Sequence, residues 1–341
     1  MQQTFFPAEW HSQSGIQLTW PHVGTDWADI LDEVNNCYLS IAREIIKREK
    51  LLIVASANSY VEQYFSDEEK NNIIFTKVES NDTWARDHSA ISVFIDNKPT
   101  LLDFGFNGWG LKYAANLDNQ INYKLYNNSV FNFDVEYQNN LNFILEGGSI
   151  ETDGKGTLLT SSKCLLAPNR NQPLTKEQIE AHLKSTLGIN RVLWLDYGFL
   201  AGDDTDSHID TLARFCDEDT IAYVKCDDII DQHYFELKQM ESELKSFVKS
   251  DGKPYNLLPL PMVDALYGNN GRLPATYANF LIINNAVLVP TYGTTKDEIA
   301  KSQFKKQFPD REIVGIDCRT LIKQNGSLHC ITMQFPEGFI R

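Results

Sequence analysis

The sequence lacks any run of about 18 consecutive apolar residues, the length that a membrane-spanning helix needs. Its first residues, "MQQTFFPAEWHSQSG", lack the basic start and the apolar stretch of a secretory signal. Basic residues are also scarce, with 31 Lys and Arg against 46 Asp and Glu and a net charge of -15. We therefore expect a cytoplasmic protein that binds neither membranes nor nucleic acid, whereas a cationic partner is compatible with this charge.

Three further features are missing. There is no CxxC spacing, so neither a zinc ribbon nor a disulfide framework is indicated. There is no glycine-rich nucleotide loop after a first strand, which disfavours the alternative of a doubly wound sheet. No linker or low-complexity tract divides the chain, so residues 1–341 are predicted to form a single domain. The six cysteines are expected to be free thiols: Cys37, Cys164, Cys216, Cys226, Cys318 and Cys330.

What the sequence does contain is a recurring order of helix and strand. Residues 26–50 carry apolar side chains at helical spacing, Thr25 is the predicted cap, and a buried strand follows at 51–56. Paired extended segments also occur, such as those on either side of the "TDGKG" turn at 152–156. The spacing of the later strands, about 60 residues, predicts an α/β fold of strand-strand-helix-strand units around a centre. The later predicted helices and strands are 175–188 with 191–196, 231–249 with 255–262, and 296–308 with 311–316.

A first polar segment, "NDTWARDHSAISVFI", precedes an apolar strand. Asp82, Arg86 and Asp87 form either an Asp–Arg pair where the strand begins or part of a site. Trp84 favours a site, because an aromatic ring beside carboxylates can line a pocket for a cation.

A second segment, "LEGGSI", places Glu146 after an apolar strand and before two glycines. Glycine pairs permit a bulge, and bulges re-aim side chains beside active sites. The simpler alternative is an edge-strand glutamate near a bulge.

The third segment, "GDDTDSHID", contains four aspartates and His208. A calcium loop is disfavoured because the glycine at loop position six and the closing Glu are missing; counted from Asp204, position twelve is Phe215. A two-metal carboxylate site stays open. The other alternative is that His208 and Asp210 lie on one face of an extended stretch, where they serve as acid/base and anchor.

The last segment is "NGSLHCITMQFP", in which Cys330 follows a glycine-containing turn and a histidine. A free cysteine is often only a small buried hydrophobe. The turn, the adjacent histidine and the carboxylates elsewhere favour a nucleophile instead. Cys164, Cys226 and Cys318 lie in apolar or strand-like runs and are predicted to be core residues.

Taken together, these segments resemble the agmatine deiminase and bacterial-type peptidylarginine deiminase family of guanidine-modifying enzymes. The similarity runs through nearly the whole chain, in the strings "FPAEWHSQSGIQLTWPH", "DTWARD", "DFGFNGWG", "LEGGSIETDGKGTLL", "NRNQP", "GDDTDSHIDTLARF", "RLPATYANFLIINNAVLVP", "FPDREIVGIDCRTLI" and "HCITMQFP". The resemblance implies a five-bladed, pseudo-symmetric α/β propeller of ββαβ units, the pentein fold, with the site on the central axis.

The resemblance also implies roles for individual residues. Cys330 is expected to be the nucleophile and His208 the general acid/base. Asp87, Asp210 and Glu146 are the expected carboxylates around the guanidinium, with the role of Glu146 open between orienting His208 and binding a guanidinium nitrogen.

Trp84 and Asp204 are expected to be further substrate contacts. No metal and no organic cofactor are implied, and a homo-oligomer stays open. Two turns depart from the family pattern: Asn325-Gly326-Ser327-Leu328 replaces a glycine run followed by Asn, and Ser207 replaces a glycine. His88-Ser89-Ala90 likewise replaces a Gly-Pro after Asp87.

The implied activity is the deimination of agmatine to N-carbamoylputrescine and ammonia through an S-alkylthiouronium on Cys330. Peptidylarginine or another guanidino compound is the alternative substrate. A metal-dependent hydrolase and a non-catalytic polyamine-binding protein are the alternatives from other classes.

Overall fold

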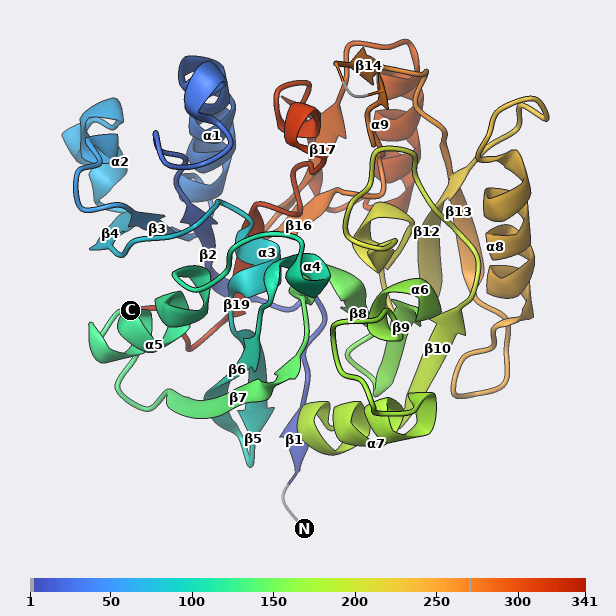
Figure 1. Cartoon of the computed structure of the whole chain (residues 1–341), viewed down its shortest axis with the longest axis horizontal. Helices are drawn as coiled ribbons and strands as arrows, with labels where there is room; N and C mark the ends of the chain where they lie inside the picture. Colours follow the sequence, from blue (N-terminus) through green and yellow to red (C-terminus); the bar gives the residue numbers. More distant parts are fainter. Residues whose placement is uncertain (1–2, 270) are drawn as a thin grey trace.

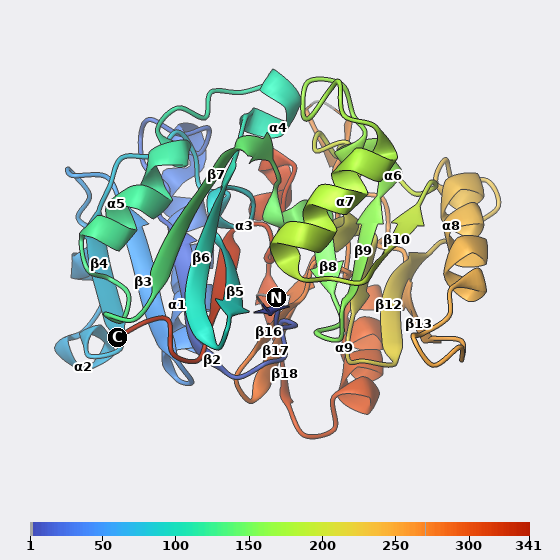
Figure 2. The same ribbon diagram turned by 90° about the horizontal axis from the view of Figure 1, so that it is seen from below.

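A computed structural model of the chain describes residues 3–269 and 271–341. Within these residues, five sheets of three or four strands surround the middle of the molecule, and the longer helices lie outside them (Figure 1). Figure 2 shows the same arrangement from below, with α5, α7 and α8 on the outer side of their sheets. None of the helices in the described part of the chain is long and apolar enough to cross a bilayer.

Each of the five sheets contains the same strand–strand–helix–strand unit. An antiparallel pair is followed by a helix and then by a strand parallel to the second strand of the pair. The units are β19-β2-α1-β3, β5-β6-α5-β7, β8-β9-α7-β10, β11-β12-α8-β13 and β16-β17-α9-β18. The predicted spacing of about 60 residues corresponds to three of these units.

The first unit joins the two ends of the chain, because β19, at Thr332–Pro336, pairs with β2, at Gln13–Thr19. The other strands of the units are β3 Lys50–Ala55, β5 Ile91–Ile95, β6 Lys98–Gly105, β7 Glu136–Ile144, β8 Ile150–Thr152, β9 Thr157–Ser161, β10 Arg191–Leu195, β11 Ala213–Phe215, β12 Thr220–Lys225, β13 Asn256–Pro261, β16 Leu281–Ile283, β17 Ala286–Thr291 and β18 Glu312–Asp317. Further strands are β1 Thr4–Phe5, β4 Ile73–Lys77, β14 Tyr267–Gly268 and β15 Gly271–Arg272.

The helices form where the apolar spacing predicts them. The unit helices are α1 Leu31–Ile46, α5 Ile121–Asn127, α7 Lys176–Leu187, α8 Tyr234–Ser246 and α9 Lys296–Gln307. Short helices are α2 Asp67–Lys70, α3 Ala85–His88, α4 Gly108–Leu111 and α6 Ser162–Leu165. The 3-10 turns are η1 Ala28–Ile30, η2 Val61–Tyr64, η3 Asp118–Gln120, η4 Gly147–Ser149, η5 Ile209–Thr211 and η6 Leu321–Gln324.

The predicted start of the first helix was wrong. Thr25 does not cap α1, because its hydroxyl donates to the carbonyl of His22 in a preceding turn. The 3-10 turn η1 lies between, and α1 begins at Leu31 after Ile30, which gives no side-chain cap. The helix still buries the predicted apolar face, and Val34, Tyr38 and Ile41 are inaccessible to solvent.

The predicted turn between β8 and β9 is confirmed. Gly154 and Gly156 have φ angles of 66° and 91°, a region that glycine occupies without strain. Asp153 Oδ1 accepts hydrogen bonds from the amides of Lys155 and Thr157, at 2.7 and 2.9 Å. These contacts fix the register of the hairpin, and with it the position of η4 just before β8.

Candidate active site

The predicted site residues occupy equivalent places in the repeated units. Each lies on the short segment that immediately precedes the first strand of its unit: Asp87 before β5, Glu146 before β8, His208 and Asp210 before β11, and Cys330 before β19. The unit that begins with β16 contributes Asn279 from the same place. Because the five sheets surround the middle of the molecule, these segments meet there (Figure 1).

Cys330 lies against Asp210 and Asn279. Its side chain is buried, and Sγ is 3.8 Å from Asp210 Oδ2 and 3.3 Å from Asn279 Nδ2. Asn279 is held in place because its Oδ1 accepts a hydrogen bond from the amide of His329 at 2.8 Å. Burial and the charges of Asp210 and Asp87 raise the pKa of the Cys330 thiol well above its ordinary value. This shift favours the protonated form of the thiol.

Asp210 has one anchored and one free carboxylate oxygen. Oδ2 is 2.7 Å from His329 Nδ1, whereas Oδ1 is buried without a hydrogen-bond partner. Burial works against ionisation of Asp210, yet the hydrogen bond and charge of His329 hold its pKa below the ordinary value. Asp210 is thus a carboxylate with one oxygen ready to accept.

Asp87 is held by two donors. The amide of Gly148 donates to its Oδ1 at 3.0 Å, and Trp109 Nε1 donates to its Oδ2 at 2.9 Å. Burial raises the pKa of Asp87 to about 6, with the nearby His208 acting in the opposite direction. Asp87 is therefore mostly ionised at neutral pH, and a bound cation increases that fraction.

His208 lies between two carboxylates. Its Nδ1 is 3.6 Å from Asp87 Oδ1 and its Nε2 is 3.7 Å from Glu146 Oε2. Burial alone would lower the pKa of His208, but Asp87, Cys164 and Glu146 raise it well above the ordinary value. The ring therefore carries a proton at neutral pH and is able to act as an acid.

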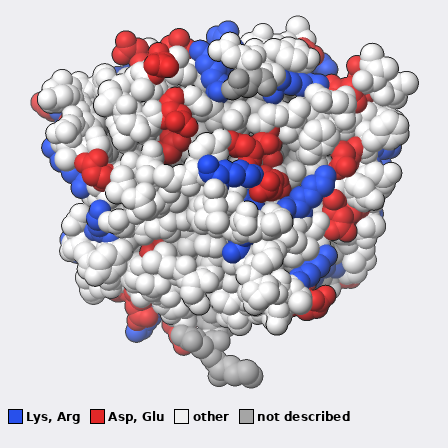
Figure 3. Space-filling model, in the orientation of Figure 1, with Lys and Arg blue, Asp and Glu red and all other residues white. Residues whose placement is uncertain are grey.

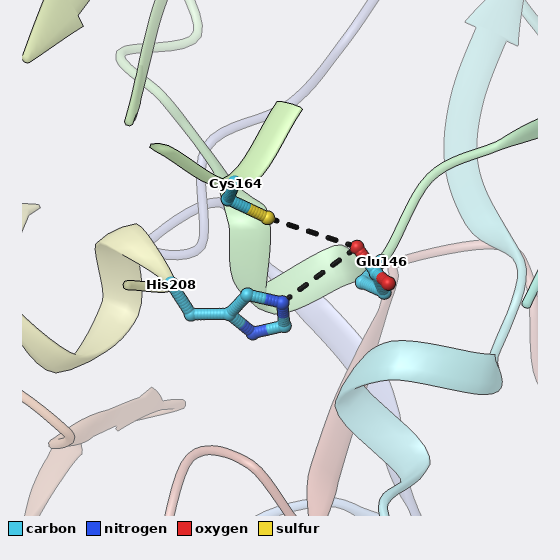
Figure 4. A group of neighbouring side chains, drawn as sticks. All are labelled: Glu146, Cys164 and His208. Carbon is cyan, nitrogen blue, oxygen red and sulfur yellow. Dashed lines mark hydrogen bonds and ion pairs between the residues drawn. The ribbon is translucent and has the colours of Figure 1, made fainter. Parts of the chain in front are cut away.

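Glu146 is buried beside an arginine. Arg170 Nε lies 3.0 Å from both of its carboxylate oxygens, and Arg170 in turn contacts Asp206 at 2.7 Å. Although burial opposes ionisation, His208 and Arg170 hold the pKa of Glu146 below its ordinary value. Figure 4 shows the carboxylate of Glu146 facing both His208 and Cys164, and Cys164 Sγ is 3.8 Å from Glu146 Oε2.

These three side chains do not fit a metal ion. The ligand atoms of Glu146, Cys164 and His208 lie within 4.8 Å of one another. However, Arg170 already contacts both oxygens of the carboxylate, and its charge would repel a metal cation. Burial also raises the pKa of Cys164, which opposes the thiolate form that binds metals.

A cavity lined by both Cys330 and Asp87 opens at the site. Both predicted substrate contacts, Trp84 and Asp204, line it. The other carboxylates in its lining are Asp26, Asp82 and Asp203, and none of the described lining residues is basic. Burial raises the pKa of Asp82 to about 6, with the charge of Asp26 adding to the shift. Figure 3 shows acidic side chains gathered near the centre of this face, with Lys and Arg side chains beside them.

The structure brings all seven predicted residues to one place, but it corrects several local expectations. His208 and Asp210 are not in an extended stretch, because the 3-10 turn η5 contains Asp210. Glu146 is not an exposed edge-strand residue; it is fully buried. Arg86 pairs with Glu9 at 3.5 Å rather than with an aspartate.

Cys164 is a core residue, as predicted, and also contacts Glu146. Sequence reasoning gave no role to Arg170, Asn279 and Trp109, which contact Glu146, Cys330 and Asp87. The similarity strings "NRNQP", "RLPATYANFLIINNAVLVP" and "DFGFNGWG" contain them. Single residues of this kind, in loops and outside any recognisable motif, show no sequence pattern that would indicate a role in a site.

With this geometry established, comparison with known proteins is informative. The model of the Porphyromonas-type peptidyl-arginine deiminase family matches residues 5–336. A Legionella pneumophila protein, provisionally named an agmatine deiminase, is 32% identical over 345 residues, which cover 98% of this chain and 96% of that protein.

Two solved structures are similar over almost their whole length. A Porphyromonas gingivalis protein, provisionally named an arginine deiminase, is 53% identical with a TM-score of 0.96, covering 99% of this chain and 100% of that one. A Cys-to-Ser variant of the C. jejuni agmatine deiminase, solved with substrate bound, is 41% identical with a TM-score of 0.92, covering 100% and 98%.

Proposed function

Because the chain belongs to the Porphyromonas-type peptidyl-arginine deiminase family, we propose that it is an agmatine deiminase, which converts agmatine to N-carbamoylputrescine and ammonia. One observation carries this proposal. The Cys330 thiol lies at the base of an acidic cavity, beside two carboxylates and within the same buried group as a protonated histidine. That arrangement suits a planar cation that must be held, attacked and protonated.

The carboxylates orient the guanidinium. A guanidinium is planar and presents parallel N–H donors, which match the geometry of a carboxylate. Asp210 Oδ1 has no partner and is free to accept from the substrate. Asp87 lines the cavity and supplies the second negative charge. Together they hold the central carbon of the guanidinium next to Cys330 Sγ.

The bound cation activates the nucleophile. In the free protein the charges of Asp210 and Asp87 raise the pKa of Cys330. The positive charge of the substrate compensates these charges, so the thiol releases its proton to solvent as substrate binds. Asn279 Nδ2 then donates to the thiolate from 3.3 Å.

His208 moves the protons of both half-reactions. The thiolate forms a C–S bond to the guanidinium carbon, and protonated His208 delivers its proton to the departing nitrogen as the C–N bond breaks and ammonia leaves. The neutral ring then accepts a proton from water, whose oxygen attacks the S-alkylthiouronium carbon. The C–S bond breaks, the thiolate is restored, and the remaining hydroxyl proton of the adduct passes to solvent as the neutral ureido product leaves. Protein side chains carry every one of these steps.

Glu146 acts as a positioning residue for His208 in this scheme. Both of its oxygens contact Arg170, so it has little capacity to bind a guanidinium nitrogen as well. Its Oε2 faces the ring nitrogen Nε2 of His208 and keeps the ring charged. Of the two roles left open by the sequence, these contacts support orienting His208.

The cavity favours agmatine over arginine. At the end away from the guanidinium, agmatine carries only an ammonium group. Free arginine carries both an ammonium group and an α-carboxylate at that end. Asp82 and Asp204 line the cavity and attract the ammonium, and no described lining residue could pair with the α-carboxylate. Trp84 supplies apolar surface between these charges.

We propose for the whole chain, residues 1–341, a single catalytic domain whose five units form a five-bladed propeller of the pentein type. The equivalent placement of the site residues before the first strand of each unit supports this fold. The pairing of β19 with β2, which unites the two ends of the chain, supports it as well.

The proposal is tested by ammonia release from agmatine, arginine and an arginyl peptide. We expect kcat/KM for agmatine to exceed that for the other two by at least about tenfold. Asp204→Asn should raise KM for agmatine several-fold, whereas Asp227→Asn, at an exposed site paired with Lys225, should leave it unchanged. Equal or reversed preference would refute the substrate. Loss of activity in EDTA that a divalent ion restores would refute the metal-free mechanism.

A further inference from the structure

His329, next to the nucleophile, belongs to a buried charge cluster that the reaction scheme has not used. Its ring is 1% exposed and lies between two carboxylates. Nδ1 is 2.7 Å from Asp210 Oδ2 and Nε2 is 2.7 Å from Glu9 Oε2. Cys330 and His329 are consecutive, so the backbone that carries the thiol on one side carries this ring on the other.

The two short contacts define the form of the ring. A neutral imidazole has a single N–H donor, and a carboxylate can only accept. Both contacts are hydrogen bonds only if both ring nitrogens carry a proton. The pKa of Glu9 and that of Asp210 are both held below their ordinary values, despite burial, by arginine and by this histidine. The geometry therefore fits a ring that donates from both nitrogens, one to each carboxylate.

The far side of the cluster fixes the ring. Glu9 also accepts from Arg214 at 2.7 Å and from the amide of Ile282 at 2.7 Å. Arg214 in turn donates to Glu151 at 2.5 Å, and all of these side chains are buried. A buried carboxylate with three donors cannot move without leaving one of them unpaired, which is costly.

We propose that His329 is a positioning residue for deimination, which keeps Asp210 ionised and turns its free oxygen toward the substrate, while Glu9 anchors the histidine ring from behind. This inference rests on the proposed function. His329 occupies Oδ2 of Asp210, and only Oδ1 stays free. His329 is not among the described residues that line the cavity with Cys330 and Asp87, so it acts through Asp210.

Other charges also face Asp210. Cys330 and His208 lie on the cavity side, Asp87 adds a negative charge, and Arg214 lies behind. Of these, His329 alone makes a hydrogen bond shorter than 3 Å to the carboxylate within the described residues. If the ring is replaced by a neutral group, burial and the negative charge of Asp87 favour the protonated form of Asp210. A protonated Asp210 no longer binds the guanidinium as an anion.

The experiment compares pH profiles of kcat/KM for agmatine in wild type and His329→Gln. In wild type the acid limb follows the cavity carboxyls Asp87 and Asp82, each with a pKa of about 6. In His329→Gln, Asp210 must also lose a proton, so the limb should become steeper and move by about one pH unit toward higher pH. The loss should exceed about a hundredfold at pH 6 and shrink to less than about tenfold at pH 8.

The matched control is His233→Gln. His233 is also 1% exposed and contacts an aspartate, Asp231, at 2.6 Å, but it lies between β12 and α8, where its Nε2 accepts from the amide of Ala201 and touches neither Asp210 nor Cys330. It should lose thermal stability and keep the wild-type pH profile. If His329 had only a structural role, His329→Gln would likewise keep the shape of the wild-type pH profile and would lose kcat/KM equally at every pH. That result would overturn the inference.

Glu9→Gln decides the matter if His329→Gln does not fold. This substitution keeps the shape of the Glu9 side chain and removes the negative charge behind the His329 ring. The acid limb of the pH profile should therefore move in the same direction as in His329→Gln, by a smaller amount. An unchanged acid limb would overturn the inference. A wild-type protein that deiminates no guanidino compound would contradict the proposed function itself. An active wild type with a parallel His329→Gln profile would contradict only the role of His329.

Discussion

Gly148 leaves no room for a side chain where three of the proposed catalytic groups meet. A Cβ atom on this residue would lie 2.6 Å from His208 Nδ1, 2.8 Å from Asp87 Oδ1 and 3.2 Å from Asp210 Oδ2. Its φ angle is one that other residues adopt, so space and not backbone strain requires the glycine. The backbone of η4 therefore forms one wall of the site.

Gly148→Ala tests this close approach. The methyl group must displace His208 or Asp87, and displacement of a reacting group by about 1 Å can cost about a hundredfold in rate. We expect kcat/KM for agmatine to fall by about that factor while the melting temperature changes little. Gly315→Ala in β18, where the nearest atom is Thr291 Cγ2 at 3.1 Å, is the control and should keep full activity. Wild-type rates in Gly148→Ala would show that these groups do not meet there.

Single residues were predictable where their chemistry is visible in the sequence. A cysteine after a turn, and an Asp–His–Asp pattern in "GDDTDSHID", pointed to Cys330, His208 and Asp210. Arg170 and Asn279 were not predictable in this way. Asn279 matters only because the fold brings it against Cys330, 51 positions away, and no local pattern records that contact.

At the scale of elements, α7 shows how local chemistry begins and ends a helix. Thr175 Oγ1 accepts from the amide of Gln178, and the side-chain oxygen of Gln178 accepts from the amide of Thr175, which makes a complete capping box. Gly188 ends the helix with a φ angle of 68°. Neither residue is part of the site, so substitutions at these two positions should change the stability of the protein without changing its activity.

Thr175→Ala removes the side-chain half of that cap. We expect the free energy of unfolding to fall by about 1 kcal/mol in urea titrations, with no change in kcat/KM. Thr295 occupies the corresponding position of α9 but makes no side-chain cap. Thr295→Ala should therefore change the stability much less, and equal losses in the two variants would contradict this account of the caps.

Elements with a long apolar period were predictable, and short polar ones were not. The helices at 175–188 and 296–308 correspond to α7 and α9, because apolar spacing over several turns is a strong signal. The segment around His208 was expected to be extended but contains a 3-10 turn. The six polar residues in a row, 203–208, carry no period, and contacts from other units decide their conformation.

At the scale of the whole molecule, five similar units each bring one segment to a common centre. Three of the units could be inferred from the spacing of later strands. The first unit could not, because its strands come from opposite ends of the chain and have no common spacing in the sequence. The nucleophile lies on the returning segment, so folding of the last residues onto β2 completes the site.

Part of the net negative charge of the chain is concentrated around the cavity. Carboxylates from three segments line the cavity beside Cys330, and they include Asp26, Asp82, Asp87 and Asp204. Their common field attracts a cation before any contact is made. The same field opposes formation of the thiolate, so the protein is activated by the substrate charge that it selects.

The most direct measurement is intact-protein mass spectrometry after rapid acid quenching with agmatine, followed by peptide mapping. Wild type should gain the mass of agmatine minus ammonia on the peptide that contains Cys330, and Cys330→Ser should gain nothing. Cys164→Ser, which alters the other cysteine near His208, should still form the adduct. Product formation without an adduct, or an adduct on Cys164, would contradict the assignment of Cys330 as the nucleophile.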